Sequence, residues 1–108
     1  MQNLIYVGVI LSATATGVAA SEQGIASYYQ NPHYSGLIAA HKSLPFGSLV
    51  KVVNLDNGRS AMLKIVDRGP FIRGRIIDVS PFAADLLGFR EAGVARVRIE
   101  TSDVPAPL

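Results

Sequence analysis

The strongest constraint on the fold is a hairpin signal in the middle of the chain, Asp56-Asn57-Gly58. Asn-Gly accepts the positive φ angles that a tight turn between antiparallel strands requires. Residues 49–55 before the turn and residues 60–66 after it are both rich in apolar and β-branched residues. The second segment places Ala61, Leu63 and Ile65 on one face and Lys64 on the other. The sequence therefore predicts a β-hairpin with one apolar face.

Further short segments carry strand patterns. Three of them are predicted to form strands: residues 24–29, 75–79 and 95–100. In the last, Ala95, Val97 and Ile99 alternate with charged residues, which predicts an inward and an outward face. Residues 37–41 fit either a turn of helix or a strand edge, and residues 30–36 contain the breakers of a loop.

One helix is predicted over residues 82–87. Ser80 suits the N-cap, Pro81 suits the first helical position, and Gly88 suits the C-terminal end. Apolar residues four apart predict its buried stripe: Phe82 with Leu86, and also Ala83 with Leu87. The fold class is thus mainly β, with about six short strands and one or two short helices. A closed or partly closed barrel is expected, because closure hides the strand edges.

Composition excludes several classes of site. The 108-residue chain has no Cys, so it can form neither a disulfide, a Cys-based zinc site nor a lipidated Cys. Its two His, His33 and His41, are too few for a metal cluster, and we predict neither metal nor cofactor. The net charge of +2 is weak evidence for a nucleic-acid partner, and none is predicted.

The first twenty residues have the pattern of a secretory signal. An apolar run, Leu4–Leu11, is followed by small residues that end in Val18-Ala19-Ala20. Cleavage after Ala20 is expected, and a retained anchor is the alternative. The run is short for a membrane span, which needs about 20 apolar residues. We therefore expect a signal peptide at 1–20, a domain at 21–101 and a flexible tail at 102–108. The protein is expected to be exported, to be periplasmic or associated with the cell wall, and to have no stable membrane span after cleavage.

Two acids, Asp67 and Asp78, lie at the two ends of a loop rich in Gly, Pro and Arg. Each sits beside branched apolar residues, where a strand meets a loop. A carboxyl group at such a place can be aimed at a ligand and partly desolvated, as a general acid requires. The alternatives are local: Asp67 accepts backbone N–H bonds in the turn before Gly69-Pro70, and Asp78 assists the helix that follows.

Four ordered segments resemble the rare lipoprotein A family of exported bacterial proteins. They are Ala-Ala-His-Lys-Ser-Leu-Pro-Phe-Gly-Ser (39–48), Val-Asn-Leu-Asp-Asn-Gly-Arg-Ser (53–60), Val-Asp-Arg-Gly-Pro-Phe-Ile-Arg-Gly-Arg (66–75) and Ile-Asp-Val-Ser (77–80). The resemblance covers about Gly24 to Glu100, including the opening Gly-Ile-Ala-Ser-Tyr-Tyr. It implies a six-stranded double-psi β-barrel, related to the barrels of expansins and barwins.

The resemblance also implies an activity, the lytic transglycosylation of peptidoglycan. Such enzymes cut the bond between N-acetylmuramic acid (MurNAc) and N-acetylglucosamine (GlcNAc) without water and leave a 1,6-anhydro end. One carboxyl group protonates the leaving oxygen and then helps the C6 hydroxyl attack the anomeric carbon. By match to the family, Asp67 is the expected acid and base, His41 orients it or binds substrate, and Asp78 is the second candidate for the acid. The alternative for His41 is a turn histidine that bonds a backbone carbonyl.

Four more residues are candidates for substrate binding. Arg68, Arg73 and Arg75 form a basic edge that could hold carboxylates of the wall polymer. Their alternatives are a solvated loop or salt bridges to Asp67 and Asp78. Tyr28 and Tyr29 face opposite sides of a strand, so one is expected in the core while the other, Tyr29, offers a platform to a sugar ring.

One departure from the family keeps two functions open. Family members usually carry a Glu between the first strand and Ala-Ala-His, whereas residues 30–38 contain no acid. The first function is an endolytic transglycosylase that acts on stem-peptide-poor glycan strands. The alternative is a non-catalytic peptidoglycan-binding or expansin-like, wall-loosening barrel. The expected partner is the glycan strand, with the cell-division machinery as a further candidate.

Overall fold

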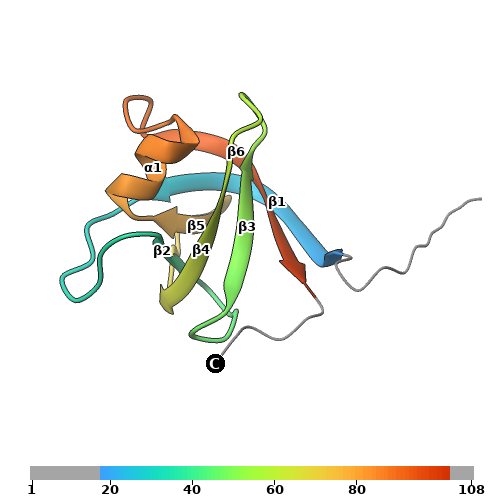
Figure 1. The fold of residues 1–108 in the computed structure, drawn as a ribbon, viewed down its shortest axis with the longest axis vertical. Helices are drawn as coiled ribbons and strands as arrows, with labels where there is room; N and C mark the ends of the chain where they lie inside the picture. Colours follow the sequence, from blue (N-terminus) through green and yellow to red (C-terminus); the bar gives the residue numbers. More distant parts are fainter. Residues whose placement is uncertain (1–17, 103–108) are drawn as a thin grey trace, which may run out of the picture.

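Six strands and one helix build the domain in the computed structural model, which describes residues 18–102 (Figure 1). In chain order they are β1 (Val18–Tyr28), β2 (Ile38–His41), β3 (Leu49–Asn54), β4 (Ser60–Asp67), β5 (Arg75–Val79), α1 (Pro81–Leu87) and β6 (Val94–Ser102). Residues 1–17 of the expected signal peptide and residues 103–108 of the expected tail lie outside the described residues. Two strands run beyond the expected boundaries, since β1 begins at Val18 and β6 ends at Ser102.

The strands close into a barrel in the order β1-β5-β2-β4-β3-β6, with β6 paired to β1. The pairs β1–β5 and β2–β4 are parallel, and the other four pairs are antiparallel. Closure pairs every strand on both sides, which removes the exposed edges of an open sheet. The predicted class, a mainly β six-stranded barrel with a short helix, is confirmed, and residues 38–41 are a strand rather than a helical turn.

The core fills the inside of the barrel with the inward residues of each strand. Ala95, Val97 and Ile99 of β6 are 4%, 0% and 2% exposed, as their alternation predicts. Leu63 and Ile65 of β4 are fully buried as well. The predicted hairpin joins β3 to β4, and Gly58 in its turn has a φ of 79°. The apolar period of two therefore identified the core faces of both strands correctly.

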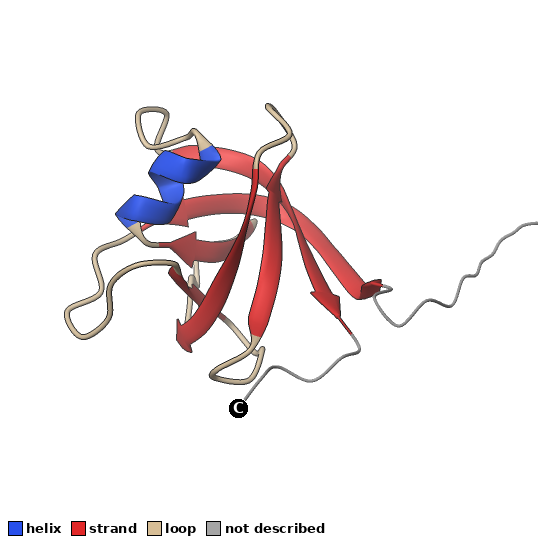
Figure 2. Cartoon of the chain, in the orientation of Figure 1, coloured by secondary structure: helices blue, strands red, loops and turns tan. Residues whose placement is uncertain are grey.

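Helix α1 lies over one end of the barrel, beside β4 and β1 (Figure 2). Its predicted ends are confirmed: the Ser80 hydroxyl accepts a hydrogen bond from the Ala83 N–H at 3.1 Å, and Gly88 is left-handed with a φ of 79°. The other end of the barrel is bordered by the loop after β2, where Leu44 packs against the core.

The predicted stripe of Phe82 and Leu86 is wrong. These side chains are 52% and 45% exposed, and the buried residues of α1 are Ala83, Ala84 and Leu87. Successive side chains on a helix point about 100° apart, so burying one stripe rather than the adjacent one corresponds to a rotation of the whole helix about its axis. The small alanines let α1 approach the barrel closely, and this packing selects the second predicted stripe, Ala83 with Leu87.

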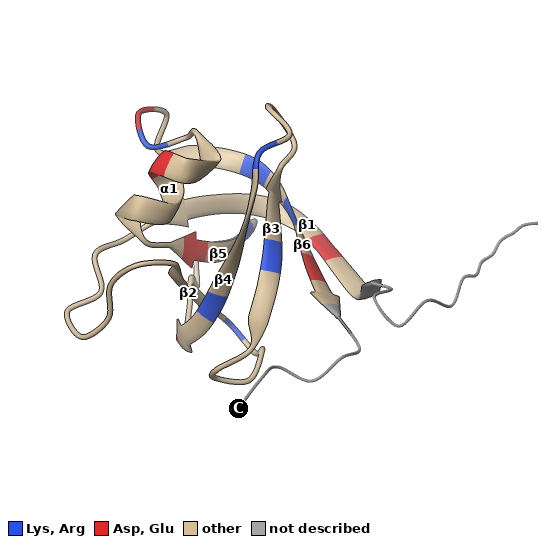
Figure 3. Cartoon of the chain, in the orientation of Figure 1, with Lys and Arg blue, Asp and Glu red and all other residues tan. Residues whose placement is uncertain are grey.

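Charged side chains of both signs are spread over the strands and loops (Figure 3). Within residues 18–102, no helix has the length and apolar character needed to cross a membrane.

Candidate active site

Four residues form a continuous row across the outer face of β1, β5, β2 and β4. Ser27 pairs with Asp78, Asp78 pairs with Ala40, and Ala40 pairs with Asp67. Directly paired residues share a face of the sheet, and none of these four belongs to the core cluster. The two acids thus flank Ala40, and the two small residues of the row are buried, with Ser27 7% and Ala40 2% exposed.

A register shift in the β2–β4 pair turns Asp67 outward. Ala39 pairs with Ile65, yet the next residue, Ala40, pairs with Asp67 rather than with Val66. Side chains alternate along a strand, so unshifted pairing would place Asp67 on the inner face with Ile65. The extra residue re-aims the carboxyl group, as bulges beside functional sites often do.

Three donors hold the Asp67 carboxyl group. The Tyr29 hydroxyl donates to Oδ2 at 2.9 Å, the Asn31 amide donates to the same oxygen at 3.3 Å, and the Arg68 backbone N–H donates to Oδ1 at 2.8 Å. The Arg68 contact is the local turn bond that was the alternative for Asp67. The two side-chain donors come from the end of β1 and the loop after it, and they fix the carboxyl group at a strand end.

Tyr29 directly follows β1, and its hydroxyl reaches Asp67 at the end of β4. Its hydroxyl accepts a hydrogen bond from the Asn31 amide at 2.8 Å. Burial is the largest cause that raises the pKa of Tyr29, and the nearby carboxylates of Asp67 and Asp78 raise it further against the opposing Asn31 bond. The hydroxyl therefore stays protonated at neutral pH and donates to Asp67. Tyr28 turns to the core and packs against Phe89, with ring centroids 6.3 Å apart.

Asp78 lies within β5 and is half-buried. Its carboxylate accepts a short hydrogen bond from the Ser27 hydroxyl. The helix that follows is capped by Ser80 instead, so the contacts of Asp78 are to the barrel wall.

His41 lies on the other face of β2, at one end of the barrel, because it pairs with the core residue Ile77. Its Nδ1 accepts hydrogen bonds from the Ser43 and Leu44 backbone N–H groups, each at 3.1 Å. Nε2 therefore carries the proton and donates to Glu22 of β1 at 2.9 Å. His41 is 5% exposed, and its side chain bonds two backbone N–H groups and the Glu22 carboxylate rather than the backbone carbonyl expected as the alternative.

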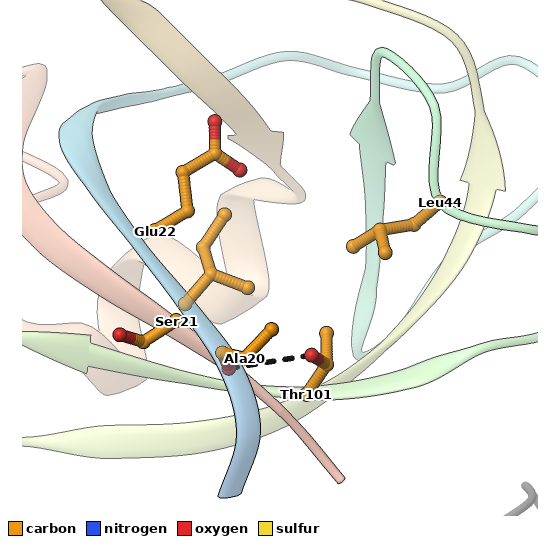
Figure 4. Close-up of a pocket in the computed structure, with 6 residues that line it drawn as sticks. Ala20, Ser21, Glu22, Leu44 and Thr101 are labelled. Carbon is orange, nitrogen blue, oxygen red and sulfur yellow. Dashed lines mark hydrogen bonds between the residues drawn. The ribbon is translucent and has the colours of Figure 1, made fainter. Parts of the chain in front are cut away.

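Glu22 and Leu44 border a small hollow at this end of the barrel (Figure 4). Thr101 closes another side and donates to the Ala20 backbone carbonyl at 3.3 Å. Asp67 pairs with Ala40 on the outer face, whereas His41 pairs with the core residue Ile77, so the structure places these two predicted residues on opposite faces of the barrel wall. Among the described residues, no hydrogen bond joins their side chains.

The three candidate arginines differ in their contacts and exposure. Arg68 donates to the backbone carbonyls of His41 and Leu44, at 3.3 Å and 2.8 Å, and its guanidinium group lies 4.0 Å from the centre of the Phe46 ring. It therefore ties the loop after β2 to the loop after β4. Arg73 is exposed, and Arg75 is half-buried at the start of β5. No salt bridge within residues 18–102 joins any of the three to Asp67 or Asp78.

Sequence reasoning missed three residues of these sites: Ser27, Asn31 and Glu22. Asn31 was read only as a loop breaker, although its position two residues after Tyr29 is what brings its amide to Asp67. Ser27 meets Asp78 through the pairing of β1 with β5, whereas Glu22 reaches His41 from β1, which is not paired with β2; no local motif marks either contact. Among residues 18–102, no three His, Asp or Glu side chains are grouped as a metal site requires. The outer row can offer two carboxyl groups, Asp67 and Asp78, to a ligand.

This barrel, with its two parallel pairs and its outer row of acids, is a double-psi β-barrel. An expansin from Clavibacter michiganensis has the same fold, with a TM-score of 0.64 over 82% of this chain and 54% of the expansin, at 17% sequence identity.

Sequence comparison identifies the family within that fold. The lytic transglycolase family matches residues 21–99, and this chain belongs to it, as the resemblance to rare lipoprotein A predicts. A protein of Nostoc sp. named "Probable endolytic peptidoglycan transglycosylase RlpA" is 48% identical over 80% of this chain. A protein of Vibrio cholerae named "Endolytic peptidoglycan transglycosylase RlpA" is 44% identical over 81% of it. The matched region spans 27% and 38% of the length of these two relatives.

Proposed function

We propose that this chain carries the catalytic domain of an endolytic transglycosylase that cuts peptidoglycan glycan strands between MurNAc and GlcNAc. The observation that carries the proposal is the Asp67 carboxyl group, turned to the outer face of the barrel beside Asp78 and held there by Tyr29 and Asn31. The names of the relatives, which span the same domain, support the substrate class.

Asp67 performs both proton transfers in this proposal. In the first step its protonated carboxyl group donates to the glycosidic oxygen, and the bond from that oxygen to the anomeric carbon breaks. In the second step the carboxylate accepts the proton of the C6 hydroxyl while O6 bonds to the anomeric carbon. The products are a free GlcNAc hydroxyl and a 1,6-anhydro MurNAc end, no water is consumed, and Asp67 regains its proton.

The neighbours of Asp67 have separate roles. Tyr29 and Asn31 position its carboxyl group through their hydrogen bonds. Asp78, on the far side of Ala40, stabilises the positive charge that develops at the anomeric carbon, and it is the second candidate for the acid.

The remaining predicted residues act around this centre. Arg73 and Arg75 are available for carboxylates of the polymer, and Tyr29 lies where a sugar would reach Asp67. Arg68 and His41 act on the loop after β2, since both bond its backbone.

The second candidate function is a barrel that binds glycan strands without cutting them. The specific observation in its favour is that the loop between β1 and β2 brings an amide, Asn31, to Asp67 and contains no acid. A site with fewer carboxyl groups than the family usually has would retain its affinity for sugars.

A product assay separates the two functions. The full chain is incubated with purified sacculi and with glycan strands stripped of stem peptides, and anhydro-muropeptides are sought by mass spectrometry. We expect anhydro products from the native chain and none from Asp67→Asn. Asp85→Asn, at an exposed acid on α1, is the matched control and should retain activity. Strand binding without any anhydro product would establish the non-catalytic function instead.

The proposed substrate sets the location. Peptidoglycan lies outside the cytoplasmic membrane, so the chain acts after export, in the periplasm or at the cell wall. The cell-division machinery stays a predicted partner, and cleavage after Ala20 stays a predicted processing step, which would shorten β1 by three residues.

A further inference from the structure

A hollow opens beside the proposed active site, between the loop after β1 and the first turn of α1. Asn31 and Tyr34 line it from the loop, and Phe82 lines it from the helix. Its volume is about 220 Å³. Sites that enclose a drug-sized ligand commonly measure about 300 to 1,000 Å³, so this smaller hollow suits a single ring.

Two aromatic side chains line the hollow, one from the loop and one from the helix, and both are exposed. Tyr34 is 54% exposed and Phe82 is 52% exposed, although α1 buries its other apolar face. Aromatic faces carry negative charge density and attract the C–H groups on the flat side of a pyranose ring. Phe82 is exposed rather than buried as predicted, and its exposed ring therefore gives the barrel a surface suited to a sugar.

The polar lining of the hollow indicates which ligand it takes. Amides, hydroxyls and backbone line the rest, and no Lys, Arg, Asp or Glu is among the described residues around it. A charged ligand would find no partner there, whereas sugar hydroxyls and an N-acetyl group would.

Asn31 joins this hollow to Asp67. Its side-chain oxygen accepts hydrogen bonds from the backbone N–H groups of His33 and Tyr34, at 2.7 Å and 3.0 Å. Its amide nitrogen donates to Tyr29 and to Asp67. One buried side chain therefore fixes the Tyr34 backbone and the carboxyl group together. The Ser80 hydroxyl donates to the Gly36 backbone carbonyl, which ties the same loop to the start of α1 and so to Phe82.

We propose that Tyr34 and Phe82 form a subsite that holds one uncharged sugar ring of the glycan strand on which Asp67 acts. This inference rests on the proposed function for the identity of the strand. The subsite contacts a ring away from the scissile bond, so it contributes to binding more than to the chemical step.

Binding is measured in the full chain carrying Asp67→Asn, so that no strand is cut. The probe is a fluorescently labelled, stem-free glycan strand, followed by anisotropy. Tyr34→Ala and Phe82→Ala should each raise Kd about five- to tenfold. The matched control is Leu86→Ala, which removes a similarly exposed apolar side chain from α1 outside the hollow and should leave Kd unchanged. Melting temperatures of all variants should agree within a few degrees.

The outcomes separate the two proposals. If Tyr34→Ala and Phe82→Ala bind as tightly as their parent, the subsite is refuted, whatever the native chain cleaves. If both weaken binding while the native chain yields no anhydro product, the subsite stands and the enzymatic function fails. If the parent binds no strand at all, the subsite is overturned, and the product assay on the native chain decides the enzymatic function separately.

Discussion

Replacing Tyr29 by Phe removes one oxygen atom and tests how Asp67 is held. The hydroxyl donates to Asp67 at 2.9 Å and accepts from Asn31 at 2.8 Å. The Phe ring has the same shape as the Tyr ring, so the side chain should keep its position. Asp67 keeps its two other donors, and Asn31 keeps its longer bond to Asp67.

The expected size of the effect follows from these contacts. Asp67 becomes charged as it gives its proton to the glycosidic oxygen, and a hydrogen bond to a charged group contributes about 1.5–3 kcal/mol. Asp67 is half-buried and water can replace the lost donor, so we expect the lower end, about 1.5 kcal/mol. Each 1.36 kcal/mol is a factor of ten in rate, so kcat on stem-free strands should fall about tenfold with KM nearly unchanged.

The assay is the initial rate of anhydro-end formation, with thermal unfolding followed in parallel. Tyr28→Phe is the matched control, because it removes a hydroxyl from the adjacent residue on the opposite face of β1. It should leave kcat unchanged. A wild-type kcat for Tyr29→Phe, or an equal loss in both variants, would refute the positioning of Asp67 by this hydroxyl.

Three further predictions test the barrel and the electrostatics of the site. Ile99→Asp buries an unpaired charge, which costs several kcal/mol, and should abolish the folded circular dichroism signal. Arg98→Ala, on the opposite face of β6, should lower the free energy of unfolding by less than about 1 kcal/mol. Equal losses in the two variants would disprove the assigned facing. Asn54→Ala removes a buried amide that donates to the Leu87 carbonyl at the end of α1, and should lower the free energy of unfolding in urea by about 1–3 kcal/mol; an unchanged midpoint would contradict this. The Tyr29 phenol should ionise above its ordinary pKa of 10.0, so Tyr29→Phe should remove the part of the phenolate absorbance that appears at the highest pH. If the variant instead loses absorbance that appears at lower pH than that of the other tyrosines, the pKa shift has the opposite sign.

The fold was largely predictable because its signals are local. The alternation of Ala95, Val97 and Ile99 specifies which face of β6 is buried, and the caps at Ser80 and Gly88 specify where α1 begins and ends. The helix orientation was only half predictable. Two apolar stripes lie side by side on α1, and only the shape of the barrel end decides between them.

The acids of the candidate site could be predicted from the sequence, but the residues that contact them could not. Asp67 ends β4 and Asp78 lies within β5, both in segments that the motifs mark. Their common face nevertheless depends on a register shift that alternation alone does not predict. Asn31 reaches Asp67 across 36 positions of sequence, and Glu22 reaches His41 across the mouth of the barrel. Such pairs arise from closure of the sheet, and a single sequence records no trace of them.

The unpaired Val66 in β4 makes the facing of Asp67 depend on the register between β4 and β2. Deleting that one residue would place Asp67 directly after Ile65, where ordinary alternation still turns its side chain to the solvent side. Keeping Val66 but losing the shift would instead carry Asp67 into the apolar interior of the barrel, where an ionised carboxylate opposes folding. The acid that the shift exposes therefore also selects the shifted register, because the unshifted one would bury a charge.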